Sequence, residues 1–457
     1  MEAAAGRAAA VVRRWIVLGA LVGAIAHACG LTVAQEARGG ADAVAFGRTF
    51  DELVALARRE YWDPEHLDWE AWAERYRAQA VAAPDRAGFD AVMGRMVRAL
   101  ADDHSSWLGL PGEHDADEAS PGNEVGPPRL GLQFTFVTGR GLVVERVFPG
   151  TPADTAGLRR GDVIVAVDGT SLAERRGLVE ASGVLVEAMA DGPVHLLIER
   201  RRNRFEVEVE GATVLFADVA AVPYGTMLDP FTGYLAVPTF NAPGVGVAAH
   251  RALADLRDRG AVALVLDLRG NQGGRLVEAG LLLGAFVAGP WVEAVARGEV
   301  AWKGTTERVG DDLVSLLVRP SEEVLGAART TRSVAWREPL VVLVDAGTVS
   351  AGEVVALALQ DHGRATVVGV PTSGNVEAVQ GFTLMDGSRV LLAVADMRGA
   401  HGLVYADGVV PDVVARVDRA DLARGLDLPL VEARRVLGGL PFTPDRRFRR
   451  RGVARRP

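Results

Sequence analysis

The eight residues from Ala261 to Leu268 read AVALVLDL and are apolar at every position but one. A continuous apolar run of this length is typical of a parallel strand that is buried on both faces of its sheet. Leu340–Val344 and Thr366–Val368 repeat the pattern, and Leu276–Phe286 has the length and apolar content of a helix. Strands that alternate with helices predict an α/β core with a mainly parallel sheet, which we place at residues 215–440.

The composition is that of a globular protein with a sizeable core. The chain has 457 residues, of which 49% are hydrophobic and 24% are charged, which is enough for two or three domains. The formal net charge of -9 argues against a nucleic-acid-binding surface. We therefore expect no nucleic-acid partner, and the sequence indicates no particular oligomeric state.

Residues 1–34 have the features of a secretory signal peptide. A basic stretch, MEAAAGRAAAVVRR, precedes the apolar run Trp15–Ala26, and small residues follow it. Cleavage after Ala28 and cleavage after Ala34 both fit. The apolar run is short for a membrane span. We expect a mature chain without an integral span, exported to a bacterial periplasm or to the extracellular space.

The two ends of the chain carry further features. Cys29 is the only cysteine, which excludes an intrachain disulfide. Lipid modification of Cys29 is an alternative route to the membrane, but Ala26 stands where a lipoprotein signal usually carries a larger aliphatic residue. Residues 441–457 are rich in arginine and have no core-forming pattern, which predicts a solvated basic tail.

Residues 35–118 are predicted to form a helical N-terminal segment. Apolar residues recur at helical spacing on two faces, which are Phe50, Leu53, Val54, Ala57 and Tyr61 on the first and Phe89, Val92, Met93, Met96, Val97 and Leu100 on the second. The polar stretch GEHDADEASPGNEVGPP, residues 112–128, is rich in turn formers and predicts a linker between domains.

Short alternating strands follow the linker. The stretch VVERVFPGTPADTAGLRRGDVIVAVDG resembles a PDZ domain, which we place at residues 128–214. The resemblance implies that Leu130, Gly131 and Leu132 begin an edge strand whose N–H groups hold a peptide carboxylate while the peptide adds a further strand. The alternative is a structural domain whose groove is blocked.

Five motifs lie in order around this domain. They are LADDHSSWL (100–108), LDLRGNQGG (266–274), AGTVSAGE (346–353), VVGVPTSGN (367–375) and GVVPD (408–412). Together they resemble the C-terminal processing proteases and their tricorn-like relatives. The resemblance implies a ClpP/crotonase-like α/β core with a helical N-terminal segment and an inserted PDZ domain. It also implies a serine peptidase that needs no metal or organic cofactor and that acts on peptides or on the C-terminal tails of proteins.

Ser350 has two competing interpretations. Followed by Glu353 three residues later, it forms the sequence pattern of a capping box at a helix N-terminus. A serine at such a turn can also present its hydroxyl to a cleft, beside backbone N–H groups that stabilise an oxyanion. The resemblance assigns the nucleophile to Ser350 and the oxyanion donors to Gly273 and Ala351.

The chain departs from the processing proteases at the catalytic base. Their lysine is replaced by Asn375, and an amide cannot accept a proton. The only lysine, Lys303, falls in a stretch that reads as a polar loop, too hydrated for a neutral amine. Histidine is the natural substitute because its pKa lies near neutrality. His104 matches the histidine of the tricorn-like relatives, and His401 is the competing candidate.

Two residues are candidates for the acid that would orient the histidine. Glu377 lies two positions beyond Asn375 and shares its face if the segment is extended, while Asp407 is the alternative. These residues predict an exported serine endopeptidase that works through an acyl-enzyme with a Ser-His pair in place of Ser-Lys. The second hypothesis is a catalytically inactive, PDZ-containing peptide-binding relative, which the missing lysine favours.

Overall fold

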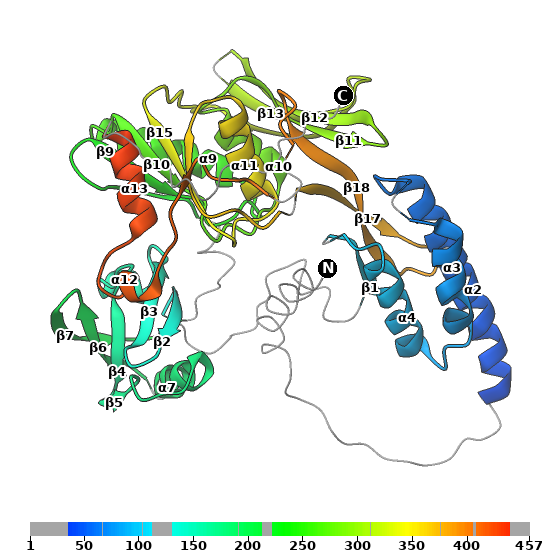
Figure 1. Ribbon diagram of the computed structural model, residues 1–457, viewed down its shortest axis with the longest axis horizontal. Helices are drawn as coiled ribbons and strands as arrows, with labels where there is room; N and C mark the ends of the chain where they lie inside the picture. Colours follow the sequence, from blue (N-terminus) through cyan, green and yellow to red (C-terminus); the bar gives the residue numbers. More distant parts are fainter. Residues whose placement is uncertain are drawn as a thin grey trace.

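The computed structural model divides into a helical N-terminal part, a PDZ unit and a core (Figure 1). It describes residues 35–65, 67–102, 104–111, 130–190, 192–212, 222–310, 312–374, 376–404 and 408–438. The expected signal peptide, linker and basic tail lie outside the described residues. Cys29, Asn375 and Asp407 lie outside them too, so the predictions that concern these residues remain predictions.

Three helices form the N-terminal part, α2 (Gln35–Glu60), α3 (Trp69–Val81) and α4 (Arg86–Arg98). The carboxylates of Asp68 and Asp85 accept hydrogen bonds from first-turn N–H groups and so fix where α3 and α4 begin. Both predicted apolar faces face inward. All of their residues are buried except Val54, which is partly buried. These helices confirm a helical N-terminal part, but residues 106–109 of the predicted segment 35–118 form a strand.

The helical part shares its hydrophobic core with strands that come from the far end of the chain. Leu384, Val390 and Leu392 are buried among the helix residues. Strand β1 (Ser106–Gly109) also pairs antiparallel with β18 (Arg389–Gly399). The loop between α4 and β1, which contains His104, is therefore held against the core.

The PDZ unit is a small sheet with one long helix. Its strands are β2 (Leu132–Val137), β3 (Gly141–Val147), β4 (Val163–Val167), β5 (Thr170–Ser171), β6 (Val194–Arg200) and β7 (Asn203–Val209), in the order β2-β3-β4-β6-β7 with β5 beside β4. The short helix α6 (Pro152–Thr155) and the longer α7 (Leu178–Ala190) complete the unit, and α7 packs on β2, β3 and β4. Strand β2 lies at the sheet edge, as predicted, and begins at Leu132.

The core contains the predicted parallel sheet. Its strands are β8 (Tyr224–Met227), β9 (Thr232–Ala236), β10 (Ala263–Asp267), β15 (Leu340–Val344), β16 (Thr366–Gly369) and β19 (Val413–Val414), in the order β19-β16-β15-β10-β9-β8. All neighbours run parallel except β8 and β9. Helices α9 (Val245–Asp258), α10 (Leu276–Leu283) and α11 (Ala351–Asp361) share one core with this sheet, and α13 (Leu428–Leu437) packs on its opposite face.

A second, antiparallel sheet was not predicted. It is formed by β1, β18, β11 (Gly289–Ala296), β12 (Glu299–Val309), β13 (Asp312–Val318) and β14 (Val324–Thr330), and β17 (Glu377–Thr383) pairs with β18. Lys303 lies in β12, so the prediction of a loop there was wrong, although its side chain is exposed as expected. Helices α10 and α11 pack between the two sheets.

The C-terminal part of the predicted core domain packs on the PDZ unit. Leu422 of α12 (Arg419–Leu422) and the adjacent Ala423 are buried against Val143, Val163 and Val165. Part of the segment predicted as core, residues 215–440, therefore also contributes apolar side chains to the PDZ unit. Figure 1 shows α12 beside the PDZ sheet, directly before α13 returns to the core.

The Asp427 carboxylate joins the PDZ unit, the core and the C-terminal segment. It accepts hydrogen bonds at 2.8 Å from Arg160 of the PDZ unit and at 2.8 Å from Arg269 of the core. Burial alone would raise the pKa of Asp427, but Arg269 and Arg160 outweigh it and lower the pKa below its ordinary value. Arg146 of β3 also donates to the carbonyl of Arg269.

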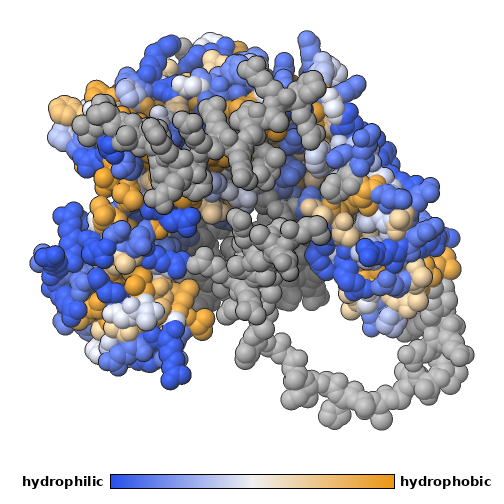
Figure 2. Space-filling model, in the orientation of Figure 1, coloured by the Kyte–Doolittle hydropathy of each residue, from blue (hydrophilic) through white to orange (hydrophobic). Residues whose placement is uncertain are grey.

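The described helices give no candidate for a membrane span, since none is both long and apolar enough to cross a bilayer. On the face shown in Figure 2, hydrophilic side chains cover much of the PDZ unit and of the helical part. Apolar residues appear between them in smaller groups.

Replacing Asp427 by alanine should destabilise the protein. The change leaves Arg160 and part of Arg269 without their buried partner, so we expect a loss of about 2 to 4 kcal/mol in the free energy of unfolding. Asp255→Ala is the control, because Asp255 pairs with Arg259 at the exposed surface and should cost less than about 0.5 kcal/mol. Denaturant unfolding measures both, and equal losses would contradict the role given to Asp427.

Candidate active site

Three loops meet at the carboxyl edge of the parallel sheet. Residues 270–274 follow β10, residues 345–350 follow β15 and residues 370–374 follow β16. Oδ1 of Asp345 accepts hydrogen bonds from the N–H of Gly270 at 2.8 Å and from Gly347 at 2.9 Å. The region beyond the carboxyl ends of parallel strands is where α/β proteins commonly bind ligands.

Ser350 directly precedes α11, and its backbone has a strained conformation. Its φ of 54° and ψ of -121° lie outside the regions that a residue with a side chain ordinarily adopts. Such strain tends to occur at functional sites, where the surrounding structure enforces it. Here the N–H of Ser350 donates to Oε2 of Glu353 at 2.8 Å, which is the glutamate half of the predicted capping box.

Glu353 connects Ser350 to two other motifs. Its side chain is fully buried, and Oε1 accepts a hydrogen bond from the Thr372 hydroxyl at 2.6 Å and another from the N–H of Gly374 at 2.8 Å. The Thr372 oxygen in turn accepts from the N–H of Val409 at 2.7 Å. One carboxylate thus ties the Ser350 turn to the segment after β16 and to the GVVPD motif.

The predicted oxyanion residues are neighbours. A Cβ on Gly273 would lie 2.7 Å from Cβ of Ser350 and 3.1 Å from the nitrogen of Ala351, and φ at Gly273 is 82°. Only glycine fits there without strain. However, the Gly273 N–H donates to Oδ1 of the buried Asn271 at 2.8 Å, so in this conformation it is not available to an oxyanion. Asn271 is itself held by the carbonyl of Val237.

His104 and Glu377 are in direct contact, as the sequence predicted for a histidine and its acid. Nδ1 of His104 lies 3.0 Å from Oε2 of Glu377, and the side chains are 14% and 21% exposed. An ionised carboxylate only accepts hydrogen bonds, so Nδ1 carries the proton and Nε2 keeps the lone pair that a base requires. Oδ1 of Asp102 accepts a hydrogen bond from the N–H of His104 at 2.9 Å and therefore caps this turn.

The antiparallel sheet positions this pair. The Ser105 hydroxyl accepts a hydrogen bond at 3.0 Å from the N–H of Ala393 in β18, which fixes the loop that carries His104. Glu377 is the first residue of β17 and pairs in register with Asp396 of β18. Two segments that are far apart in sequence are therefore placed by a single strand.

Asp396 is a candidate functional residue that the sequence reading missed. Burial, and after it the charge of Glu377, raises the pKa of Asp396 to about 6. Asp396 therefore places another carboxyl beside the His104–Glu377 pair, and this carboxyl changes charge just below neutral pH. A single aspartate in the otherwise apolar run VLLAVADM was the available signal.

The contacts between the described residues include no hydrogen bond from the Ser350 hydroxyl to His104. A short stretch of chain connects the two sites, because Glu377, the partner of His104, follows Gly374 by three residues, which span at most about 11 Å. His401, the competing histidine, contacts Asp361 at the far end of α11. Asp361 is the last of the eleven residues of α11 and lies about 16 Å along the axis from Ser350, so His401 is excluded as the base for Ser350.

The predicted carboxylate-binding residues lead into the edge strand of the PDZ unit. The carbonyl of Leu130 accepts from the N–H of Ala153, and that of Gly131 accepts from Phe148. Gly131 has a φ of 72°, and a Cβ there would lie 2.3 Å from the Thr151 side chain. The turn before Leu132 therefore requires glycine. The carbonyls of Leu130 and Gly131 accept hydrogen bonds from within the PDZ unit.

Glu353→Gln should destabilise the protein and the Ser350 turn. An amide can accept on one side only, so at least one of the donors Ser350, Thr372 and Gly374 loses its buried partner. We expect a loss of about 2 to 4 kcal/mol, measured by denaturant unfolding. Exposed Glu299→Gln is the control and should change stability by less than about 0.5 kcal/mol. An unchanged free energy of unfolding in Glu353→Gln would show that the carboxylate is dispensable.

Asp396→Asn should stabilise the protein at pH 7.5. The folded-state pKa is raised, so the wild type loses stability as the pH rises from about 4 through 6, and asparagine removes this loss. A shift of this size is worth about 3 kcal/mol for a fully buried group, and we expect about 1 to 2 kcal/mol because solvent screens part of the carboxyl. The gain should shrink at pH 4.5, and a gain independent of pH would contradict this account.

Comparison with known proteins gives one consistent result. The family model described as peptidase family S41 matches residues 231–415, a PDZ domain model matches 143–200 and the tricorn protease C1 domain model matches 46–98. The chain is 31% identical over 388 residues to the chloroplastic carboxyl-terminal-processing peptidase 2 of Arabidopsis thaliana, covering 80% of this chain and 69% of that protein.

Two further proteins agree with this match. The chloroplastic C-terminal processing peptidase of Tetradesmus obliquus is 32% identical over 300 residues, which cover 62% of this chain and 59% of that protein. The fold matches a solved structure of an S41 protease candidate from Bacteroides fragilis with a TM-score of 0.57 at 20% identity, covering 86% of this chain and 98% of the other. The chain therefore belongs to peptidase family S41, as a serine peptidase of the C-terminal processing group with a PDZ domain and a tricorn C1 domain.

Proposed function

We propose that this S41 peptidase is an exported endopeptidase in which His104, oriented by Glu377, replaces lysine as the catalytic base. The observation that carries the proposal is the 3.0 Å contact between Nδ1 of His104 and Oε2 of Glu377. This contact leaves Nε2 as the basic nitrogen. It forms between two segments that the sequence singled out independently, and both side chains retain some exposure from which a substrate can be reached.

The reaction would begin when the Ser350 hydroxyl attacks the carbonyl carbon of the scissile peptide bond. Its proton passes to Nε2 of His104, and Glu377 stabilises the imidazolium that forms. The N–H of Ala351 stabilises the oxyanion, and Gly273 adds a second donor once its N–H leaves Asn271. His104 then protonates the leaving amine, and water attacks the acyl-enzyme with His104 again as base.

The proposal requires the His104–Glu377 pair to close on Ser350. Support comes from Gly374, whose N–H is bound by Glu353 in the first turn of α11, only three residues before Glu377. Catalytic hydrogen bonds are often longer without substrate and tighten when it binds. Lys303 in β12 is exposed, and the contacts among the described residues do not connect it to the Ser350 turn.

The substrate class follows from the PDZ unit. Edge strand β2 can accept an additional strand, and the turn at Leu130, Gly131 and Leu132 precedes it. The relatives from Arabidopsis and Tetradesmus are named for processing carboxyl termini. We infer that this chain acts on the C-terminal tails of exported proteins. We also propose that residues 1–34 direct its export, and that its core is of the ClpP/crotonase-like kind.

The second candidate is a peptide-binding protein without catalytic activity. It is favoured by the asparagine that stands at position 375 and by the Gly273 N–H, which Asn271 occupies in this conformation. A binder would still use the edge strand of the PDZ unit. It would have no need for a histidine aligned by a carboxylate beside a strained serine.

Active-site labelling separates the two functions. The purified mature chain should react with a fluorophosphonate probe and cleave peptides, because His104 raises the nucleophilicity of Ser350. Ser350→Ala should abolish labelling, and His104→Gln should reduce kcat at least 100-fold. Glu377→Gln should reduce kcat less and alter its pH profile, since it acts through the histidine. Mass spectrometry and peptide-cleavage kinetics provide the measurements.

Asn375→Ala is the matched control for this experiment. We expect it to lower activity far less than His104→Gln, because an amide cannot serve as the base. Labelling that persists in Ser350→Ala, or a wild type that neither labels nor cleaves, would reject the proposed peptidase. Full activity in His104→Gln would reject the histidine alone and leave the serine in place.

A further inference from the structure

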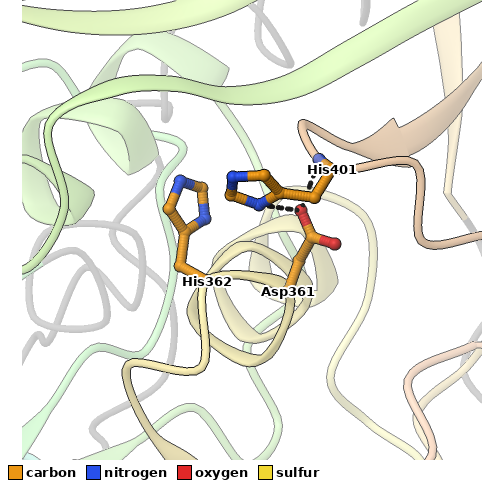
Figure 3. A group of neighbouring side chains, drawn as sticks. All are labelled: Asp361, His362 and His401. Atoms are coloured by element: carbon orange, nitrogen blue, oxygen red, sulfur yellow. Dashed lines mark hydrogen bonds and ion pairs between the residues drawn. The ribbon is translucent and has the colours of Figure 1, made fainter.

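Three side chains of types that can bind metal ions lie together at the end of α11 that is remote from Ser350. Asp361 is the last residue of α11, His362 follows it and His401 belongs to the loop after β18 (Figure 3). One donor atom from each side chain lies within 4.8 Å of the other two. No step of the proposed peptidase reaction uses them. The cluster is therefore a second candidate site in the same core.

Hydrogen bonds occupy Nδ1 of each histidine and leave Nε2 as the nitrogen that can bind a metal ion. Nδ1 of His362 lies 2.9 Å from the carbonyl of Ala358, and a carbonyl only accepts, so Nδ1 carries the proton. Nδ1 of His401 lies 3.1 Å from Oδ2 of Asp361, and the same reasoning applies. In both neutral rings the lone pair is consequently on Nε2. The two rings are in edge contact, with centroids 4.5 Å apart.

The Asp361 side chain is held in place by contacts within the protein. Its side chain is only 4% exposed, and Oδ2 also accepts from the N–H of His401 at 2.8 Å. A Cβ at position 399 would lie 2.5 Å from Cγ of Asp361, so Gly399 permits this close packing. Histidines that bind metals almost always donate their other ring N–H to a carboxylate or a carbonyl, and both of these histidines do so. His401 is 60% exposed, which leaves a route from solvent.

We propose that His362 and His401 bind a divalent transition-metal ion of the zinc class through Nε2, with Asp361 holding His401 in place and water completing the coordination. Two imidazole nitrogens suit zinc, nickel or copper, whereas magnesium and calcium prefer oxygen ligands. Small side-chain rotations are needed, because zinc lies about 2.0 to 2.1 Å from each nitrogen. The ion would link the loop after β18 to the end of α11.

Zinc titration of the untagged, metal-stripped chain tests the site. Isothermal calorimetry should give one site for Zn²⁺, and the ion should raise the Tm while Mg²⁺ should not. His401→Gln and His362→Gln should each weaken binding at least 10-fold, and Asp361→Asn about 10- to 100-fold. His195→Gln removes an exposed histidine of the PDZ unit as the matched control and should leave the affinity unchanged.

The exposed His401 keeps the test decisive if the buried Asp361 proves necessary for folding. His401→Gln should retain the unliganded Tm of the wild type and lose only the zinc response. Zinc affinity that is unchanged in His401→Gln would overturn the proposal. So would a site that disappears in His104→Gln, since that result would place the ion at the His104–Glu377 pair instead.

Discussion

The buried carboxylate of Glu353 is the contact on which the catalytic side of the molecule depends. It accepts hydrogen bonds from three donors in different segments, which are the N–H groups of Ser350 and Gly374 and the hydroxyl of Thr372. Each donor would be costly to leave unpaired in a dry interior, so the three loops at the sheet edge are constrained to one arrangement. The strained backbone of Ser350 can persist because this arrangement surrounds it.

The loop that contains Gly273 is anchored in a different way. It begins directly after Arg269, which is buried between Asp267 and Asp427 and whose carbonyl accepts a hydrogen bond from Arg146 of the PDZ unit. Burial of Asp267 opposes its ionisation, but Arg269 and the Tyr234 hydroxyl lower its pKa below the ordinary range. Glu353 therefore holds the loops after β15 and β16 from within the core, and Asp427 anchors the start of the loop after β10 through the C-terminal segment.

Much of the fold could be predicted because hydrophobic patterning is local. The parallel strands β10, β15 and β16 and the helical N-terminal part follow from short-range periodicity, whereas the edge position of β2 was implied by the resemblance to a PDZ domain. The antiparallel sheet was not predicted, because its strands come from residues 106 to 399 and local patterning does not show that they pair, although the burial of β18 alternates along the strand. The packing of Leu422 on the PDZ unit is a long-range contact with no local signature.

The sequence by itself determined which residue types are present for chemistry: a serine at a helix start, a histidine where tricorn-like relatives have one, and asparagine in place of the lysine base. It also indicated Glu377 as a partner for His104. Only the tertiary structure decided their geometry. In the structure, His104 contacts Glu377 and Asp396 lies beside them. The Gly273 N–H is hydrogen-bonded to Asn271, and His401 lies at the far end of α11. The physical reason is that hydrogen bonds and burial act between atoms that the chain brings together from distant segments, and residue order does not specify those distances.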